Sequence, residues 1–257
     1  MKWSIARWII DKFPPHKSYL EPFFGSGAVL FTKERSAIET VNDLDGEVVR
    51  LFEWIREDPE RLARAIYLTP YARGVYDRAC AAEKTEQDSF QRTVDFCARL
   101  MMGHGFRTNG EKVGWKRDVQ AREYAYAARY WCNMPEMIAA AAERLRGVQI
   151  ENKPAAELIR QFNFPNVLIY ADPPYLLETR DRKQYKHEMT DEDHVELLET
   201  LKAHEGPVLL SGYESNLYND TLRGWYREEI NTIAQTSERR REILWMNFEP
   251  PAQQSLF

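Results

Sequence analysis

Short apolar runs between chain-breaking residues recur along this sequence. Residues 167–171, Val-Leu-Ile-Tyr-Ala, are followed by one acid and two prolines. Residues 207–211, Pro-Val-Leu-Leu-Ser, begin with a proline and are followed by Gly212. Apolar runs of this length between breakers predict strands that are buried on both faces of a sheet. Further strands are predicted within residues 18–31, which also contain a glycine loop and a helix start, and at residues 38–43, 225–230 and 243–248.

Between residues 53 and 147 the pattern changes from strands to helices. Asp58-Pro59-Glu60 is typical of a helix start, residues 88–102 have apolar residues at helical spacing, and residues 122–146 are Ala-rich and again helical. The sequence therefore predicts an α/β fold with an insertion. We predict that residues 1–52 and 148–257 form the α/β domain and that residues 53–147 form an inserted, mostly helical domain.

Residues 103–117 interrupt these helices and carry Asn109-Gly110 near their centre. Asn-Gly favours a two-residue turn in which both central residues adopt positive φ, so the segment predicts a β-hairpin. Its basic and aromatic residues make it the natural element to contact nucleic acid. The alternative is an exposed turn whose charges only aid solubility. The residues concerned are Arg107, Asn109, Lys112, Trp115, Lys116 and Arg117.

Composition is compatible with a soluble enzyme and argues mildly against a nucleic-acid partner. The 257 residues are 44% hydrophobic, which suffices for a substantial core. The net charge of −5 opposes phosphate binding, but basic residues cluster at 107–117, 180–186 and 239–241. We find no stretch long enough to span a bilayer and no signal peptide, which predicts a cytoplasmic protein.

The three cysteines are widely spaced and form no C-x-x-C pair. Neither a disulfide framework nor a metal site is expected from such spacing. The sequence therefore predicts buried, reduced thiols at Cys80, Cys97 and Cys132.

The tetrapeptide Asp172-Pro173-Pro174-Tyr175 directly follows the strand predicted at residues 167–171. Ligands bind at the carboxyl ends of strands in open α/β sheets, so this segment would line a pocket. An exocyclic amine on a heteroaromatic ring is a poor nucleophile, because its lone pair is delocalised into the ring. The Asp172 carboxylate and the Pro173 carbonyl would hold its hydrogens and favour a pyramidal nitrogen, while Tyr175 stacks on the ring. The alternative is a proline-rich turn capped by an acid.

Residues 18–31 indicate a second ligand site. Gly25 and Gly27 permit close approach of a ligand, and the helix start that follows offers unpaired N–H groups. Asp43, at the end of the next predicted strand, is well placed for a ribose. The full G-x-G-x-x-G dinucleotide fingerprint is missing.

Together these segments resemble the DNA adenine-N6 methyltransferase family of the Dam type (D12 class), in which a Phe-x-Gly-x-Gly loop precedes the recognition region and Asp-Pro-Pro-Tyr follows it. The resemblance spans nearly the whole chain. It implies an S-adenosylmethionine-dependent methyltransferase sheet of Rossmann-like type with an inserted, mostly helical DNA-recognition domain. By this resemblance Glu21, Phe23, Gly25, Gly27, Asp43 and Asp172 line the S-adenosylmethionine pocket, and Asp172, Pro173, Pro174 and Tyr175 hold the target adenine.

The chain departs from the family at its start. The family usually opens with Lys-Trp-Ala-Gly-Gly-Lys, whereas this chain reads Lys2-Trp3-Ser4-Ile5-Ala6-Arg7. Arg is not a neutral replacement for Lys at a tight site. Trp3 and Arg7 are therefore carried over as cofactor-pocket candidates, with a surface amphipathic helix as the alternative.

Double-stranded DNA is the partner that the resemblance implies. An adenine inside a duplex has to be flipped out before its amine can be methylated. Residues 176–189, which include Lys183 and Lys186, would close over the extruded nucleotide and contact DNA, and Thr190-Asp191-Glu192-Asp193 is a capping box that opens the next helix. A surface connection without a function is the alternative for this segment.

The predicted function is site-specific transfer of a methyl group to adenine N6 in DNA. The alternatives are an aminomethylase that acts on cytosine N4, RNA or protein glutamine, and a catalytically idle DNA-binding relative. Neither a membrane nor an obligate protein partner is expected. Although GATC is a common target in the family, the target sequence stays open. So does the choice among epigenetic marking, restriction-modification and a phage role.

Overall fold

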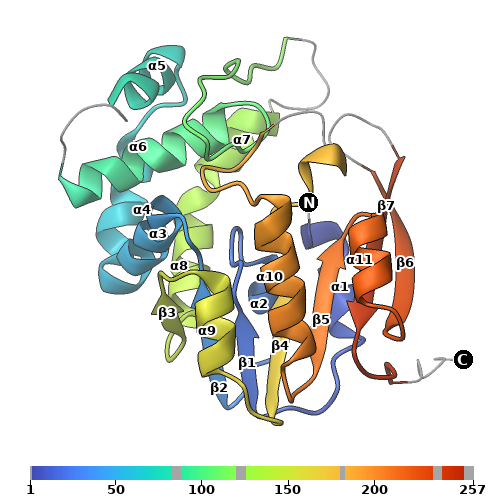
Figure 1. Cartoon of the computed structure of the whole chain (residues 1–257). Coiled ribbons are helices and arrows are strands. Elements are labelled where there is room, and N and C mark those ends of the chain that lie inside the picture. Colours follow the sequence, from blue (N-terminus) through green and yellow to red (C-terminus); the bar gives the residue numbers. More distant parts are fainter. Residues whose placement is uncertain (1, 83–87, 120–125, 180–182, 234–238, 252–257) are drawn as a thin grey trace, which may run out of the picture. The chain divides into compact units, whose positions relative to one another are not determined.

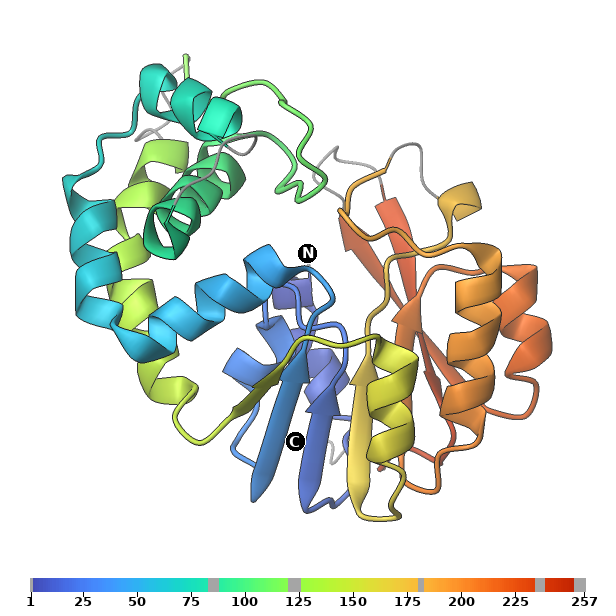
Figure 2. The same cartoon turned by 60° about the vertical axis from the view of Figure 1, so that its left-hand side comes forward.

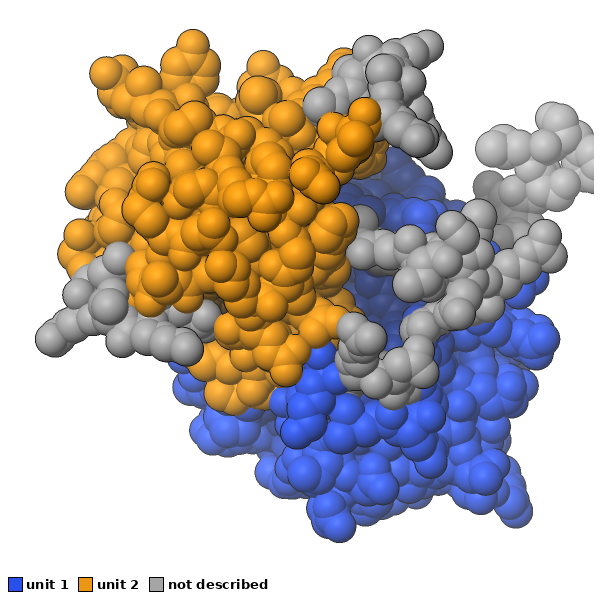
Figure 3. Space-filling model, turned by 90° about the horizontal axis from the view of Figure 1, so that it is seen from above, with its two compact units in different colours: residues 1–44, 147–183, 188–257 blue, residues 45–146, 184–187 orange. Residues whose placement is uncertain are grey.

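The computed structural model describes residues 2–82, 88–119, 126–179, 183–233 and 239–251. The chain divides into two compact units, which are coloured separately in Figure 3. Unit 1 comprises residues 1–44, 147–183 and 188–257, and unit 2 comprises residues 45–146 and 184–187. Each unit is therefore built from segments that are distant in the sequence.

Unit 1 contains a seven-stranded sheet in the order β3-β2-β1-β4-β5-β7-β6 (Figures 1 and 2). The first five strands in this order are parallel, and β7 pairs antiparallel with both β5 and β6. This arrangement confirms the predicted mixed α/β fold and its closing antiparallel pair. The strands are β1 (Ser18–Glu21), β2 (Ile38–Asn42), β3 (Gln149–Glu151), β4 (Val167–Ala171), β5 (Val208–Gly212), β6 (Tyr226–Ile233) and β7 (Arg239–Met246).

Helices cover both faces of this sheet (Figure 1). The helices α9, α10 and α11 pack on one face through a core that includes Leu158, Leu198 and Tyr218, and β4 contributes Ile169 to it. The helices α1 and α2 lie on the opposite face. The helical elements of unit 1 are η1 (Lys2–Ser4), α1 (Ala6–Ile10), α2 (Ala28–Thr32), α9 (Ala155–Gln161), η2 (Leu177–Thr179), α10 (Asp191–Lys202) and α11 (Asn216–Thr221).

Local signals in the sequence fix several of these boundaries. All five residues of β4 are buried, as the continuous apolar run predicts. The Thr190 side chain accepts from the Asp193 backbone N–H, and the Asp193 carboxylate accepts from the Thr190 N–H, which forms the predicted capping box. The helix α10 therefore begins at Asp191.

Unit 2 is helical over most of its described residues. Three acids cap its helices: the side chains of Asp45, Asp58 and Asp88 accept backbone N–H groups at the starts of α3, α4 and α6. The Ala-rich segment forms two helices rather than one, with Asn133 between them and a proline in the first turn of the second, and its residues 122–125 lie outside the described residues. The helices are α3 (Gly46–Glu57), α4 (Pro59–Leu68), α5 (Arg73–Ala82), α6 (Ser89–Met102), α7 (Tyr126–Cys132) and α8 (Met134–Arg144).

The predicted hairpin at residues 103–117 is wrong in detail. An isolated antiparallel bridge joins Gly103 to Trp115, and no strand forms between them. Gly110 has a φ of 74°, but Asn109 does not adopt positive φ, so the turn is not the predicted type. The Asn109 side chain instead accepts the Glu111 N–H at 3.2 Å. This local bond offers the backbone an alternative to the ladder of a hairpin.

No helix within the described ranges is long and apolar enough to cross a membrane. The three cysteines are free. Cys97 is buried and Cys80 is half-buried, whereas Cys132 is exposed, so the burial predicted for Cys132 is wrong.

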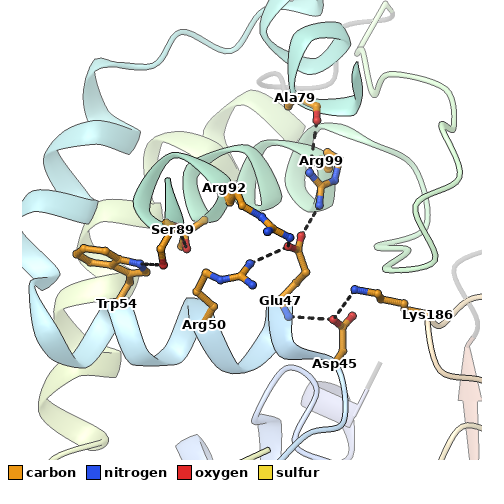
Figure 4. Close-up of polar contacts among 10 residues, drawn as sticks. Asp45, Glu47, Arg50, Trp54, Ala79, Ser89, Arg92, Arg99 and Lys186 are labelled. Atoms are coloured by element: carbon orange, nitrogen blue, oxygen red, sulfur yellow. Dashed lines mark hydrogen bonds and ion pairs between the residues drawn. The ribbon is translucent and has the colours of Figure 1, made fainter. Parts of the chain in front are cut away.

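A buried acid links the helices of unit 2 (Figure 4). Glu47, at the start of α3, is 7% exposed and forms ion pairs with three arginine side chains. Arg50 and Arg92 contact its Oε1 at 2.7 and 3.0 Å, and Arg99 contacts its Oε2 at 2.6 Å. Burial opposes the charge, but these arginines outweigh it and lower the pKa of Glu47. The carboxylate therefore holds α3 and α6 together.

We expect Glu47→Gln to destabilise unit 2 by about 2 kcal/mol, because it leaves the partly buried arginines without their counter-charge. Urea denaturation of the full chain measures the loss. Because the folded pKa of Glu47 is depressed, its contribution is present above the usual glutamate pKa and is lost as the pH falls through the folded pKa. Glu53→Gln, at an exposed position of the same helix, is the control. Equal losses for the two variants would contradict the role of Glu47.

Candidate active site

The glycine loop and Asp-Pro-Pro-Tyr leave the sheet at the same edge. The strands β1 and β4 are parallel neighbours, with Leu20 opposite Ile169. The segments that follow them, which begin at Pro22 and Asp172, therefore start side by side. Both belong to unit 1, so the structure brings together the two motifs that the sequence analysis singled out.

Asp172 is part of a polar cluster to which two other segments contribute. The Lys2 ammonium, from η1, lies 3.1 Å from Asp172 Oδ1. It also contacts the Tyr175 hydroxyl and the Glu242 carboxylate, and Tyr175 donates to Glu242. The side chains of Lys2, Asp172 and Glu242 are 14%, 21% and 6% exposed. One cation therefore serves two carboxylates in a largely buried site.

Burial and charge shift the ionisation of this cluster. Burial raises the pKa of Asp172, and the Glu242 carboxylate raises it further, against the Lys2 ammonium. Burial alone would lower the pKa of Lys2, but the two carboxylates raise it above its usual value. Burial and the same acids raise the pKa of Tyr175 well above the usual tyrosine range, so its hydroxyl stays protonated.

The Tyr175 ring lies against a second aromatic ring. Its centroid is 4.4 Å from that of Tyr213, at an interplanar angle of 61°. Tyr213 follows β5 directly, so it comes to the same edge of the sheet as Asp172. Two aromatic side chains thus accompany the carboxylate.

The glycine loop is anchored to the end of β2. Phe24 N–H donates to the Asn42 carbonyl at 2.8 Å, and Gly25 N–H donates to Asp43 Oδ2 at 2.8 Å. Gly25 and Gly27 have φ values of 49° and 66°, a region that favours glycine. The loop and Asp43 therefore form one hydrogen-bonded unit.

The two glycines differ in what surrounds them. A Cβ at Gly27 would lie 2.6 Å from ring carbons of Phe24 and Phe31, whereas a Cβ at Gly25 would meet nothing within 4 Å. Gly27 is thus required for packing. The open space at Gly25, beside the Asp43 carboxylate, fits a ligand that approaches the backbone closely.

Glu21 is the last residue of β1, directly before this loop. It is 3% exposed and accepts from the Tyr19 hydroxyl at 2.8 Å. Burial raises the pKa of Glu21 to about 8, and the Asp172 charge adds to the shift. Glu21 is therefore mostly protonated at neutral pH, and its pKa depends on the charge of Asp172.

The remaining cofactor-pocket candidates lie in different surroundings. Trp3 stacks on Phe31, with ring centroids 6.3 Å apart, and Phe31 belongs to the helix that follows the glycine loop. Phe23 is partly buried and packs against the core of the sheet. Arg7 is exposed on α1. Packing thus links Trp3 to the loop, and the exposed position of Arg7 adds no support for a cofactor contact.

Unit 2 holds most of the predicted DNA-binding residues, and several of them have partners there. Arg107 pairs with Glu111 at 2.9 Å, and Lys112 pairs with Asp77 at 2.7 Å. Trp115 packs on Tyr71, with centroids 5.6 Å apart. All three side chains thus have partners within unit 2.

Lys116 is partly buried. Its ammonium lies 3.8 Å from the centroid of the Phe106 ring, and burial lowers the pKa of Lys116 to about 8. Phe106 itself has a φ of 50°, an uncommon conformation for a non-glycine residue. Arg117 is exposed.

The segment 184–187 lies against the 103–117 loop within unit 2. Thr108 N–H donates to the Gln184 carbonyl at 3.2 Å, and Lys186 N–H donates to Thr108 Oγ1 at 3.3 Å. The Lys186 ammonium lies 3.9 Å from Asp45 Oδ1 (Figure 4). Lys183 is exposed and belongs to unit 1.

Sequence analysis missed two members of the polar cluster, Lys2 and Glu242. Lys2 belongs to the family's opening motif, but its neighbours in the sequence give no sign that it pairs with Asp172. Glu242 follows a basic run in β7, and only the pairing of Gly212 with Ile243 brings it to the carboxyl end of β5. Within the described residues, no group of three or more His, Cys, Asp or Glu side chains is placed to hold a metal ion.

Comparison with known proteins gives one family match. The model of the D12 class N6 adenine-specific DNA methyltransferase family matches residues 1–240. A solved structure that is similar to this chain is an S-adenosylmethionine-dependent methyltransferase from Agrobacterium tumefaciens, with 10% sequence identity and a TM-score of 0.42. The match covers 96% of this chain and 61% of that one. The chain thus spans less than two thirds of the length of the Agrobacterium tumefaciens methyltransferase.

The two glycines allow a matched test of the cofactor loop. Both alanine variants place a side chain in the left-handed region, at a cost of about 1 kcal/mol. Gly27→Ala adds a clash with two rings, and we expect it to lose about 3 kcal/mol in urea denaturation. Gly25→Ala should lose only about 1 kcal/mol but bind S-adenosylhomocysteine at least about tenfold more weakly in calorimetry. Unchanged binding by Gly25→Ala would show that no ligand approaches this glycine.

Proposed function

This chain belongs to the D12 class N6 adenine-specific DNA methyltransferase family, and we propose that it transfers a methyl group from S-adenosylmethionine to N6 of adenine in double-stranded DNA. The observation that carries the proposal is the juxtaposition in unit 1. The carboxylate of Asp172 and the ring of Tyr175 follow β4, next to the glycine loop that follows β1.

Asp172 activates the acceptor by accepting a hydrogen bond from its amino group. The conjugated amine then gains pyramidal character, and its lone pair points at the electrophile. The Pro173 carbonyl accepts the second hydrogen, Pro174 stiffens the segment, and Tyr175 stacks on the base. S-adenosylmethionine, when bound, supplies a methyl group on a positively charged sulfur. The amine becomes acidic as it acquires the methyl group, and it loses one proton to Asp172 or to water.

The glycine loop and the end of β2 bind the methyl donor in this proposal. Gly25 gives the ligand access to the backbone, Gly27 keeps the turn packed, and Asp43 holds the ribose. The open space at Gly25 beside the Asp43 carboxylate supports this assignment. The buried Glu21, together with Phe23 and Trp3, forms the surroundings of the pocket.

Unit 2 is the recognition domain in this proposal. Its exposed Arg117 contacts phosphates, and Arg107, Lys112 and Lys186 do so when DNA displaces their acidic partners. The target adenine is flipped out to reach Asp172, at a cost of a few kcal/mol. The enzyme then acts where its DNA lies, in the cytoplasm of a bacterium or of a phage-infected cell.

The product of the reaction tests this proposal. The protein is incubated with S-adenosylmethionine that carries a labelled methyl group and with unmethylated duplex DNA, and the DNA is digested to nucleosides. We expect label in N6-methyladenine. Label in cytosine, or transfer only to added RNA or protein, would contradict the assignment of the substrate.

Asp172→Ala tests the role of the carboxylate in the same assay. We expect the rate to fall about a hundredfold or more, because the amine loses the acceptor that orients it. Binding of S-adenosylhomocysteine should be largely kept. Asp220→Ala, at an exposed position of α11, is the control and should methylate normally. Normal transfer by Asp172→Ala would remove this residue from the mechanism.

A further inference from the structure

Two side chains outside the Asp-Pro-Pro-Tyr segment are built into the acceptor site. Lys2 reaches Asp172 from η1, and Glu242 reaches Tyr175 from β7. In the antiparallel ladder Gly212 lies opposite Ile243, so Glu242 lies beyond the end of β5, at the level of Tyr213. Glu242 is 5% exposed. A buried carboxylate at this edge of the sheet requires partners, which here are Lys2 and Tyr175.

The Lys2 ammonium contacts three polar groups of the cluster. It forms an ion pair with Asp172 and hydrogen bonds with Glu242 and the Tyr175 hydroxyl. The Tyr175 hydroxyl accepts from Lys2 and donates its own hydrogen to Glu242. Glu242 therefore fixes both the ring that would stack on the acceptor and the cation that neutralises Asp172.

The Lys2 ammonium also occupies a position on Asp172 that an acceptor needs. It lies 3.1 Å from Oδ1, as an N–H donor of a bound amine would. When an amino group takes that position, Lys2 loses one of its two anionic partners. Glu242 is then the carboxylate that remains to hold it.

We propose that Glu242 is a positioning residue of the acceptor site, which holds Tyr175 in place and retains Lys2 when the target amino group replaces the lysine at Asp172. This inference rests on the proposed function, since it takes the group that enters to be the amine of a nucleobase. Glu242 does not touch the acceptor itself, and it acts through the two side chains that it binds.

The charges of the cluster give this role a distinctive signature. Asp172 has to be ionised to accept the amine, so activity falls as the pH drops through its pKa. The Glu242 carboxylate raises this pKa, and the Lys2 ammonium lowers it. Removing either charge therefore shifts the acid limb of the pH profile, and the two shifts have opposite directions. The titratable groups that face Asp172 are Lys2, Glu21, Tyr170, Tyr175, Tyr218 and Glu242.

The test compares the single-turnover methylation rate against pH for the wild type, Glu242→Gln and Lys2→Met. S-adenosylmethionine and an adenine-containing duplex that the wild type methylates are both present at saturation. We expect the acid limb of Glu242→Gln to move to lower pH and that of Lys2→Met to higher pH, each by about one unit. Glu229→Gln on β6 and Lys17→Met before β1 are exposed controls and should keep the wild-type profile. Shifts in the same direction, or equal loss of rate at every pH, would overturn the proposal.

A second measurement does not depend on methylation. Urea denaturation of the wild type, the two single variants and Lys2→Met/Glu242→Gln forms a double-mutant cycle. We expect Glu242→Gln to lower the folding equilibrium constant about tenfold less when Lys2 is already absent. Additive effects would overturn the pairing. If the cycle shows this coupling but the wild type methylates no DNA, the proposed function is contradicted while the pairing stands. The two failures are therefore distinct.

Discussion

One ammonium group serves two carboxylates at the carboxyl edge of the sheet, of which Glu242 is buried and Asp172 is partly buried. Lys2 lies between Asp172 and Glu242, and Tyr175 closes the cluster by bonding to both Lys2 and Glu242. Because the site is largely buried, each carboxylate needs a donor to face it. The acid that would bind an amine is thus held in a fixed orientation, next to a cation that an entering donor can replace.

The sheet topology makes this cluster possible. Parallel strands bring their carboxyl ends to one edge, so the glycine loop after β1 and the acidic motif after β4 emerge as neighbours. The antiparallel β7 runs beside β5 in the opposite direction, and its early residue Glu242 therefore reaches the same edge. Three distant parts of the sequence, at residues 2, 172–175 and 242, meet for this reason.

Features that depend on neighbours in the sequence were predictable. The apolar run of β4, the capping box at Thr190 and the helix starts at Asp58 and Asp88 act within a few residues, and the structure has them where the sequence indicated. Gly25 and Gly27 likewise adopt the positive φ that glycine permits. The family resemblance added assignments that the residues alone could not give.

Features that depend on distant contacts were not predictable. The roles of Lys2 and Glu242 follow from strand pairing, for which the sequence carries no local signal. Asn109 failed as a hairpin residue because its side chain bonds to Glu111 instead, and the basic residues expected to face DNA include Lys116, which is enclosed against Phe106. Binary patterns identify a basic loop, but they do not identify the side chain that each charge meets.

The pKa of Asp172 in the free protein tests the central claim most directly. Aspartate labelled with ¹³C at the side-chain carboxyl carbon reports ionisation by NMR, and the Asp172 signal is assigned by its loss in Asp172→Asn. The account predicts a pKa above the usual aspartate value of about 3.9, because burial and Glu242 outweigh Lys2. A pKa at or below that value would show that Asp172 does not share its cation with a second buried carboxylate.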